Sequence, residues 1–425
     1  MKVALVYSFE ESSWFSCTII VKNLLASYER VFGKENITHI NYSHNRHVAS
    51  SDIEVLAKSD ISKVIFIDHK PTPVNFLIKL AAAEKNISTE REFIIHVFGD
   101  FPLYLVEWRT VFEKLKGRSA KFICASQKQR NFIRKFFKQD EIQFVSPFPV
   151  QLDSFYHSDK ARKSKREELG LSKEKVFIYT GRLSLQKRIT ELIELFGEAL
   201  RTKRIESNSK LLIVGKTDEL GVPYLDHNLI CGEYFRSIDK AIIELGEFAD
   251  NIICTGVINN KELVNYYNAA DHYLSLSTYH DEDYGMSVAE ALCCGLPATI
   301  TNWAGYRSFQ LEGHEQFCQL VPVELSEYLP KIDSDCFLNL LSKTKDLNID
   351  RSEMSKVYTE HFSVASCADN LRSISEAKVE FFSESSEAMV SLTNEQFLRG
   401  NLIFKQQDSK KYNKRYFEVY DVYSE

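Results

Sequence analysis

The sequence has no run of apolar residues that approaches the roughly 20 needed for a membrane-spanning helix. Its start, MKVALVYSFEESSW, reaches acidic residues too soon to contain the apolar core of a signal peptide. Neither charge dominates, because 53 Lys and Arg stand against 59 Asp and Glu, and the net charge of −6 gives no sign of a nucleic-acid partner. The nine cysteines, an odd number set mostly in apolar runs, indicate free thiols in a reducing compartment. We therefore expect a soluble, cytoplasmic protein.

The composition is that of an ordinary globular protein, with 44% apolar and 26% charged residues. Disordered and fibrous architectures are excluded for the chain as a whole. At about 150 residues per domain, a chain of 425 residues predicts two or three domains.

Short apolar runs alternate with amphipathic stretches through the first half of the chain. The runs are apolar on both faces and predict buried strands at residues 3–7, 63–68, 93–98, 121–124 and 142–145. The stretches between them have helical periodicity, at residues 18–32, 75–85, 103–115 and 128–138. This alternation predicts an α/β domain with a parallel sheet.

The charged segment 157–166 is poor in core residues and fits a domain boundary. Beyond it the alternation restarts, with strands predicted at residues 176–180, 211–214, 252–255, 273–276 and 298–301. Helices are predicted at residues 186–200, 237–245, 261–270, 287–294 and 365–382. We expect one Rossmann-like domain over 1–155, a second over 156–365, and a C-terminal helix and tail over 366–425 that could return to the first domain. Two such domains would meet at a shared cleft, where open α/β sheets bind ligands.

The most informative stretch is residues 275–297, SLSTYHDEDYGMSVAEALCCGLP, which joins an acidic loop to a predicted helix. At its N-terminus the helix would offer free N–H groups to an anion. These groups belong to Gly285, Met286 and Ser287. Glu282 and Glu290 bracket this point and could each accept hydrogen bonds from sugar hydroxyls. Either Glu alone fits an ordinary surface residue, but the whole arrangement predicts a site for a ligand with both phosphate and sugar.

A second motif, YTGRLSLQKR at residues 179–188, follows the first strand of the second half. Gly181 permits a tight turn, while Arg182 and Lys187 would reach the carboxyl end of the sheet. A guanidinium beside an ammonium suits a diphosphate. Cations at a helix N-terminus are disfavoured by the helix dipole unless an anion joins them. For Arg188 we expect only a solvated helix start.

These motifs, in this order, resemble the signature series of the retaining glycosyltransferases of family 4, which have the α/β GT-B fold of two Rossmann-like domains facing a central cleft. The series comprises GRLS at 181–184, LIVG at 212–215, TGV at 255–257, and Glu282-x7-Glu290 followed by ALCCGLP at 291–297. The first half of the chain is similar only in outline.

The resemblance implies transfer of a sugar from a nucleotide diphosphate sugar to a saccharide, lipid-linked or protein acceptor in glycan biosynthesis, with retention at the anomeric carbon and no metal or other cofactor. Arg182 and Lys187 match the positions that hold the donor diphosphate, and Glu282 matches the carboxylate near the donor sugar. Glu290 matches the carboxylate that binds the donor ribose. The backbone donors that face the sugar or phosphate match Gly285 and Met286.

The first half departs from the family in two places. The loop over residues 7–14 lacks the paired glycines that usually approach the ligands, which motivates an alternative, a non-catalytic GT-B subunit that binds a nucleotide sugar or a partner transferase. His96 could align with the active-site histidine of the family and bond the donor sugar or the acceptor. In the other register Phe98 takes that position, and His96 packs in the core. We favour a place for His96 in the site, because Gly99 and Asp100 follow it and mark the end of the strand.

Two further patterns have competing interpretations. Asp281-Glu282-Asp283 matches the D-x-D pattern of metal-dependent transferases, but the longer acidic motif explains it better, and we predict no metal. The basic and aromatic segment 128–138 either lies on an anionic membrane surface, which would make the protein peripheral on the inner face, or packs its aromatic residues inward as an ordinary Rossmann helix. The second interpretation is favoured, as it is for the basic tail.

Overall fold

The computed structural model describes residues 1–8, 15–41, 50–68, 73–84, 90–99, 101–151, 153–217, 233–280, 282–326, 329–399 and 418–424. The chain forms two compact units, the first of Met1–Pro149 with Ser363–Ile403 and the second of Val150–Phe362 with Phe404–Glu425. The division therefore lies several residues before the predicted boundary at 155, and the predicted C-terminal region 366–425 is shared between the units. The backbone N–H of Val150 bonds the carbonyl of Phe362 at 2.8 Å, so the two ends of the main segment of the second unit are held together.

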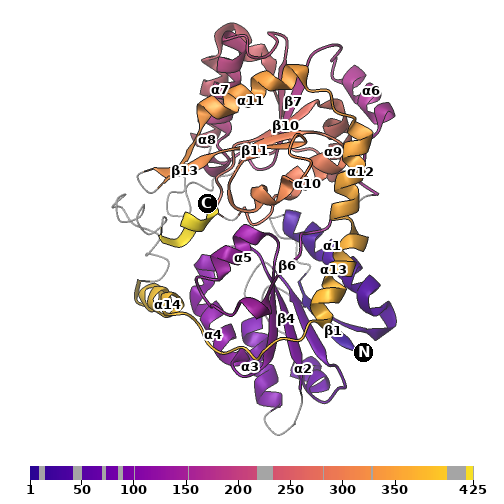
Figure 1. Cartoon of the computed structure of the whole chain (residues 1–425), viewed down its shortest axis with the longest axis vertical. Coiled ribbons are helices and arrows are strands. Elements are labelled where there is room, and N and C mark those ends of the chain that lie inside the picture. The colour runs from indigo at the N-terminus through magenta and orange to yellow at the C-terminus, as the bar shows by residue number, and fades with distance from the viewer. Residues whose placement is uncertain are drawn as a thin grey trace. The chain divides into compact units, whose positions relative to one another are not determined.

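The first unit is built on a parallel sheet of six strands in the order β2-β1-β3-β4-β5-β6, with helices on both of its faces (Figure 1). The strands are β1 (Val3–Tyr7), β2 (Ile37–Asn41), β3 (Lys63–Ile67), β4 (Glu92–Val97), β5 (Ser119–Cys124) and β6 (Gln143–Val145). The helices are α1 (Phe15–Phe32), α2 (Ser50–Ala57), α3 (Pro73–Ala83), α4 (Leu105–Leu115), α5 (Gln127–Ile133), α13 (Val364–Glu376) and α14 (Glu387–Arg399).

The five strands predicted in the first half are confirmed, and β2 is an addition. In β1 all five side chains are buried, which gives the continuous apolar run from which it was predicted. The edge strand β2 buries only Ile40, so its sequence carries no such run.

Helix α13 belongs to the first unit because it packs against α1 and because two lysines of the sheet bind its last turn. The Nζ atoms of Lys63 and Lys121 both donate to the carbonyl oxygen of Ser375 at 2.9 Å. Both ammonium groups also pair with the Glu92 carboxylate, at 2.8 Å and 3.0 Å. Lys121 is fully buried, so these partners replace the water that its charge has lost.

The second unit also contains a parallel sheet of six strands, in the order β12-β11-β10-β7-β8-β9. Its strands are β7 (Val176–Thr180), β8 (Lys210–Val214), β9 (Ile252–Gly256), β10 (His272–Ser275), β11 (Ala298–Thr301) and β12 (Cys318–Val321), with a separate antiparallel pair, β13 (Val323–Ser326) and β14 (Leu329–Ile332). The helices are α6 (Asp159–Glu168), α7 (Ile189–Arg201), α8 (Glu233–Ile243), α9 (Asn260–Ala269), α10 (Met286–Cys293), α11 (Ser334–Lys343) and α12 (Arg351–Phe362). The chain builds the sheet outward from β7 in one direction and from β10 in the other, so the strand order reverses between these two neighbours.

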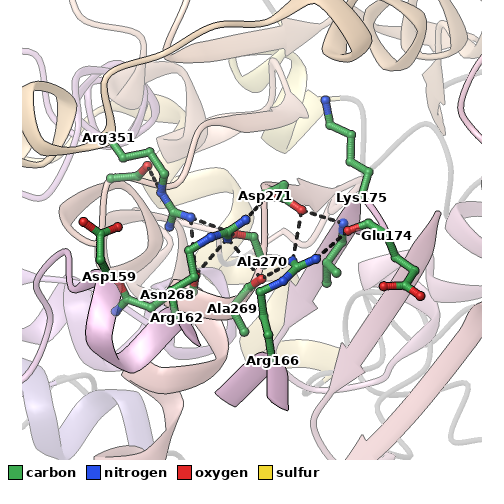
Figure 2. Close-up of polar contacts among 12 residues, drawn as sticks. Asp159, Arg162, Arg166, Glu174, Lys175, Asn268, Ala269, Ala270, Asp271 and Arg351 are labelled. Atoms are coloured by element: carbon green, nitrogen blue, oxygen red, sulfur yellow. Dashed lines mark hydrogen bonds and ion pairs between the residues drawn. The ribbon is translucent and has the colours of Figure 1, made fainter. Parts of the chain in front are cut away.

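The segment 157–166, expected to be a boundary with little role in the core, instead forms most of helix α6. Arg162 donates to the carbonyls of Asn268, Ala269 and Ala270, at the end of α9, and to the Asp271 carboxylate at 2.5 Å (Figure 2). These carbonyls have no partner within α9, so the guanidinium satisfies them. The helix is therefore held by arginine rather than by an apolar face, which is why its sequence resembles a linker.

Arg351, the first residue of α12, donates to the carbonyl of Ala270 at the same end of α9 at 2.8 Å (Figure 2). It also donates to the carbonyl of Gly295, which follows α10, at 3.0 Å. Arg166 adds a bond of 2.9 Å to the carbonyl of Ala269. The three guanidinium groups line a cavity of about 660 Å³ at the amino end of β7, and they are engaged by backbone carbonyls and Asp271. They thus tie α6, α9 and α12 together.

We predict that Glu92→Gln destabilises the protein by about 3–5 kcal/mol, because it leaves Lys63 and the fully buried Lys121 without the anion that they share. Lys121→Met should cost less, since Lys63 still neutralises Glu92. Asp60→Asn, which removes an exposed ion pair with Lys2, is the control and should change stability by less than about 1 kcal/mol. Urea unfolding followed by circular dichroism measures all three, and equal effects of Glu92→Gln and Asp60→Asn would contradict the structural role of the buried cluster.

Candidate functional site

The reversal of strand order in the second sheet places two loops at the carboxyl ends of β7 and β10. At such a point the two following connections turn to opposite faces of the sheet and leave room for a ligand between them. The loop after β7 begins with Gly181, and the loop after β10 carries Glu282 and leads into α10. Both predicted motifs therefore lie at one edge of one sheet.

Gly181 and Gly215 allow the loop after β7 to run close to the loop after β8. A Cβ atom on Gly215 would lie 1.8 Å from the carbonyl oxygen of Gly181, and φ is +147° at Gly181 and +152° at Gly215. The hydroxyl of Tyr179 donates to the carbonyl of Arg182 at 2.9 Å. These contacts hold the backbone of Arg182 at the edge of the sheet.

Arg182, Lys187 and Glu282 lie together around Tyr279. The guanidinium carbon of Arg182 lies 5.1 Å and the Lys187 Nζ 4.8 Å from the centre of the Tyr279 ring. Lys187 also forms an ion pair with Glu282, whose carboxylate accepts a second bond from the Ser277 hydroxyl at 2.6 Å. The structure therefore brings together three of the four residues predicted to be catalytic.

This ion pair is nearly buried, with 12% of the Lys187 side chain and 8% of the Glu282 side chain exposed. A cation in such a place binds an anion strongly, because little water competes with it. The pairing with Glu282 supplies the anion that the sequence argument required for Lys187, and a diphosphate beside Arg182 would be a second anion for the same cations.

Arg188 is not the solvated helix start that was expected. It adopts a left-handed conformation with φ of 54°, and α7 begins one residue later, at Ile189. Its guanidinium donates to the Thr278 hydroxyl at 2.8 Å, to Glu191 at 2.6 Å and to the carbonyl of Pro330. Arg188 therefore connects the basic motif to the acidic loop, a role that a local sequence pattern does not reveal.

Helix α10 begins where the sequence predicts, with Gly285 as its N-cap residue at φ 105°. The Tyr306 ring packs against this glycine, since a Cβ atom there would lie 2.4 Å from a ring carbon. Ser287 contacts the hydroxyl of Tyr273 on β10 at 2.9 Å, and Met286 is buried. The N–H of Val288 donates to the carbonyl of Gly285 at 3.0 Å. The N–H groups of Met286 and Ser287 come before this first bond, as at any helix start, and can donate to an anion.

Glu290, one turn into α10, is buried rather than an ordinary surface residue, with 7% of its surface exposed. Its carboxylate accepts a bond of 3.3 Å from the Tyr267 hydroxyl, which also lies 2.8 Å from the Thr180 hydroxyl at the end of β7. Burial raises the pKa of Glu290 to about 8, although the bond from Tyr267 opposes this shift. A buried carboxyl with such a perturbed pKa is a feature of functional sites.

Three side chains of this site were not predicted as site residues. They are Tyr267, Tyr279 and Arg188. Tyr279 lies inside the acidic motif, where its ring could have been noticed as a partner for cations. Tyr267 comes from α9 and meets Glu290 only through the fold.

His96 lies in the interior of the first unit, on β4, with 2% of its surface exposed. Its Nε2 is 2.7 Å from the hydroxyl of Tyr28 on α1, and the two rings pack edge to face. Burial lowers the pKa of His96 to about 3, so the ring is neutral at physiological pH. This environment is that of the alternative, a histidine packed in the core, and not that of the favoured prediction, in which His96 lines the site. Phe98, the position in the other register, follows the end of β4.

Several remaining predictions concern segments with little described structure. Most of the loop over 7–14, Asp281 of the D-x-D pattern and the basic run 410–417 lie outside the described residues. Within the described ranges, no group of three His, Cys, Asp or Glu side chains is placed to hold a metal ion. The metal-free reaction stays a prediction.

The basic segment 128–138 packs its aromatic side chains inward. Phe132, Ile133 and Phe136 are almost fully buried, and the rings of Phe132 and Phe136 contact Phe101. This result confirms the interpretation as an ordinary Rossmann helix, although α5 itself ends at Ile133. Among the helices in the described part of the chain, none is long and apolar enough to cross a membrane.

Residues 161–321 match the family model described as "Glycosyl transferases group 1". Over 179 residues, or 41% of this chain, the sequence is 27% identical to an alpha-monoglucosyldiacylglycerol synthase of Streptococcus pneumoniae. A synthase of the same name from Acholeplasma laidlawii is 25% identical over 235 residues, or 54% of this chain. The matched regions span only 36% and 52% of the lengths of these two relatives.

Solved structures with the same fold cover most of the chain. Anabaena Alr3699/HepE, in complex with UDP and glucose, superposes with a TM-score of 0.60 at 13% identity, over 88% of this chain and all of that one. The lipopolysaccharide outer core galactosyltransferase WaaB gives a TM-score of 0.61 at 16% identity, over 89% of this chain and all of that one. The chain therefore has the predicted GT-B fold.

We predict that Gly285→Ala destabilises the second unit by about 2–5 kcal/mol, because it adds a contact with Tyr306 to the cost of a left-handed alanine. The control is Gly313→Ala, which has a similar φ of +77° but no atom within 4 Å of the new Cβ, and which should cost only about 1–2 kcal/mol. Urea unfolding measures both variants. Equal losses would show that the start of α10 is not tightly packed.

Proposed function

We propose that this protein is a retaining glycosyltransferase that moves a hexose from a nucleotide diphosphate sugar to a saccharide, lipid-linked or protein acceptor. The grouping of Arg182, Lys187 and Glu282 beside the start of α10, within the region that matches the family model, carries this proposal. A diphosphate is the ligand that two cations and a helix N-terminus would bind together. The nearby carboxylates of Glu282 and Glu290 suit the hydroxyls of a sugar and a ribose.

The same arrangement supports a mechanism that needs no strong protein base. As the bond between sugar and diphosphate breaks, negative charge grows on the leaving phosphate, and Arg182, Lys187 and the first-turn N–H groups of α10 stabilise it. Glu282, held by Ser277 and Lys187, would stabilise the sugar as it becomes positively charged. A leaving phosphate oxygen takes the proton of the acceptor hydroxyl, which keeps the incoming group on the face that the phosphate leaves. We propose that no metal takes part.

The relatives support particular donors and acceptors to test first. The structure of Anabaena HepE was determined with UDP-glucose, which makes this compound the first donor to try. The two synthases named for an alpha-linked glucosyldiacylglycerol support retention and a lipid-linked acceptor. A cytoplasmic enzyme at the inner face of the membrane would reach such an acceptor.

We predict that a nucleotide sugar raises the melting temperature of the protein, since binding to the native state stabilises it, and that the protein slowly hydrolyses this donor. UDP-glucose, UDP-galactose, UDP-N-acetylglucosamine and GDP-mannose form the screen. Arg182→Ala and Lys187→Ala should each lower kcat by about 10²-fold or more, because leaving-group charge is greatest in the transition state. Lys240→Ala, an exposed lysine of α8, is the control.

Three results would count against the proposal. Binding without hydrolysis or transfer to any acceptor would favour the alternative of a non-catalytic subunit. An effect of the two variants on KM alone would indicate uniform binding of the diphosphate. Loss of activity with a chelator would overturn the metal-free mechanism.

We predict that the affinity for the nucleotide sugar increases as the pH rises from about 6 to 8. Burial raises the pKa of Glu290 in the free protein to about 8, and ribose hydroxyls that donate to the carboxylate would lower this pKa in the complex. Binding therefore releases a proton over this range, and a higher pH favours it. Calorimetry in buffers with different ionisation enthalpies measures both the affinity and the protons released.

Glu290→Gln should weaken the affinity by about 1.5–3 kcal/mol and remove its pH dependence. The matched control is Glu198→Gln on α7, where the carboxylate is exposed and both properties should stay unchanged. A pH dependence that persists in Glu290→Gln would assign the titration to another group.

A further inference from the structure

Near the end of the chain, residues 418–424 pack against the acidic loop that carries Glu282. Residues 418–420 are α-helical and continue into the short 3-10 helix η9 (Asp421–Tyr423), and both the segment and the loop belong to the second unit. Val419, Tyr420 and Tyr423 are each only 1–2% exposed. Because three of its seven residues have buried, large side chains, the segment is an integral part of the packing of this unit.

Tyr423 holds the loop on both sides of Glu282. Its ring packs edge to face on Trp303, at 5.8 Å between centres, and the indole N–H of Trp303 donates to the carbonyl of Tyr279 at 3.0 Å. The Tyr423 hydroxyl donates to the Asp283 carboxylate at 3.5 Å. Tyr423 thus contacts Asp283 directly and Tyr279 through Trp303, and Glu282 lies between these two loop residues.

Tyr420 reaches the basic motif through His280. The rings of Tyr420 and His280 lie 5.8 Å apart, and the His280 Nδ1 is 3.0 Å from the side-chain oxygen of Gln186. Gln186 immediately precedes Lys187, and its carbonyl accepts a bond of 3.0 Å from the N–H of Thr278. A chain of contacts therefore leads from the C-terminal segment to both members of the Lys187–Glu282 ion pair.

We propose that Tyr420 and Tyr423 are positioning residues of the donor site, which hold Glu282 against Lys187. The inference rests on the proposed transferase function, and it assigns to the C-terminus a part in that reaction. Of the groups that would hold the nucleotide, Glu290 and the first turn of α10 make their contacts on β7, α9 and β10 rather than on this segment, and Arg182 lies over the ring of Tyr279. Loss of the segment should therefore affect turnover much more than nucleotide binding.

The experiment compares the full chain with a truncation after residue 417 and with the double variant Tyr420→Ala/Tyr423→Ala. We expect kcat for donor hydrolysis or transfer to fall by about 10²-fold in both, the size typical of a misplacement of about 1 Å in reacting groups. The affinity for UDP and GDP, measured by calorimetry, should change by less than about threefold. The same calorimetry gives the number of nucleotides bound per chain, and therefore the fraction of the protein that is folded. The value of kcat is normalised to this fraction.

Two further variants serve as controls. Tyr423→Phe keeps the ring against Trp303 and removes the bond to Asp283, so its kcat should lie between that of the wild type and that of the double variant. Val422→Ala changes a half-buried residue between the two tyrosines and should behave as the wild type. A double variant with normal kcat, or one in which kcat and nucleotide affinity fall together, would overturn the proposal.

If the wild-type protein turns over no donor, the proposed transferase function is refuted. Hydrogen exchange then tests separately whether Tyr420 and Tyr423 hold the loop that carries Glu282. Peptides that cover residues 277–285 should exchange faster in the double variant than in Val422→Ala. Equal exchange would refute the positioning role independently of any activity. If the truncated chain does not fold, the comparison of the double variant with Tyr423→Phe provides the same decision.

Discussion

The candidate site depends on the reversal of strand order between β7 and β10, because this reversal brings two loops about a hundred residues apart in sequence to one edge of a sheet. From β7 come the turn at Gly181 and the two cations that follow it. From β10 come the acidic loop and the start of α10. No contact between Lys187 and Glu282 could form if the chain continued to add strands on the same side of β7.

The buried charged side chains of the site lower the stability of the free protein, but the same groups would bind a polar ligand strongly. Glu282 is neutralised by Lys187, whereas Glu290 has only hydroxyl partners among its described contacts, and its pKa is raised by burial. A carboxyl in this position is poorly solvated until hydroxyl groups of a ligand replace the missing water. The features that would lower stability are thus the same features that would bind a sugar nucleotide.

The sequence predicted the parts of the fold that bury side chains on both faces, since such strands leave continuous apolar runs. It did not predict β2 or β12, in which polar residues interrupt the apolar run (ITHIN and CQLV), nor α6, whose attachment to α9 uses arginine and backbone carbonyls. The site motifs were found where the relevant residues are close in sequence. The contributions of Tyr267, Tyr420 and Tyr423 could not be predicted, because each of these rings reaches the site from a distant element, without a local pattern.

The first unit is discontinuous in sequence, and this affects how the protein can fold as it is made. The carbonyl of Ser375 completes the partners of Lys63 and Lys121, and Phe382 joins the cluster of Phe122 and Phe137. A ribosome that has synthesised the first 149 residues has therefore not yet supplied these groups. All strands of the second sheet are synthesised before these groups are. The first unit can therefore be completed only after the second, and until then Lys121 lacks its carbonyl partner, which lies more than 200 residues further along the chain.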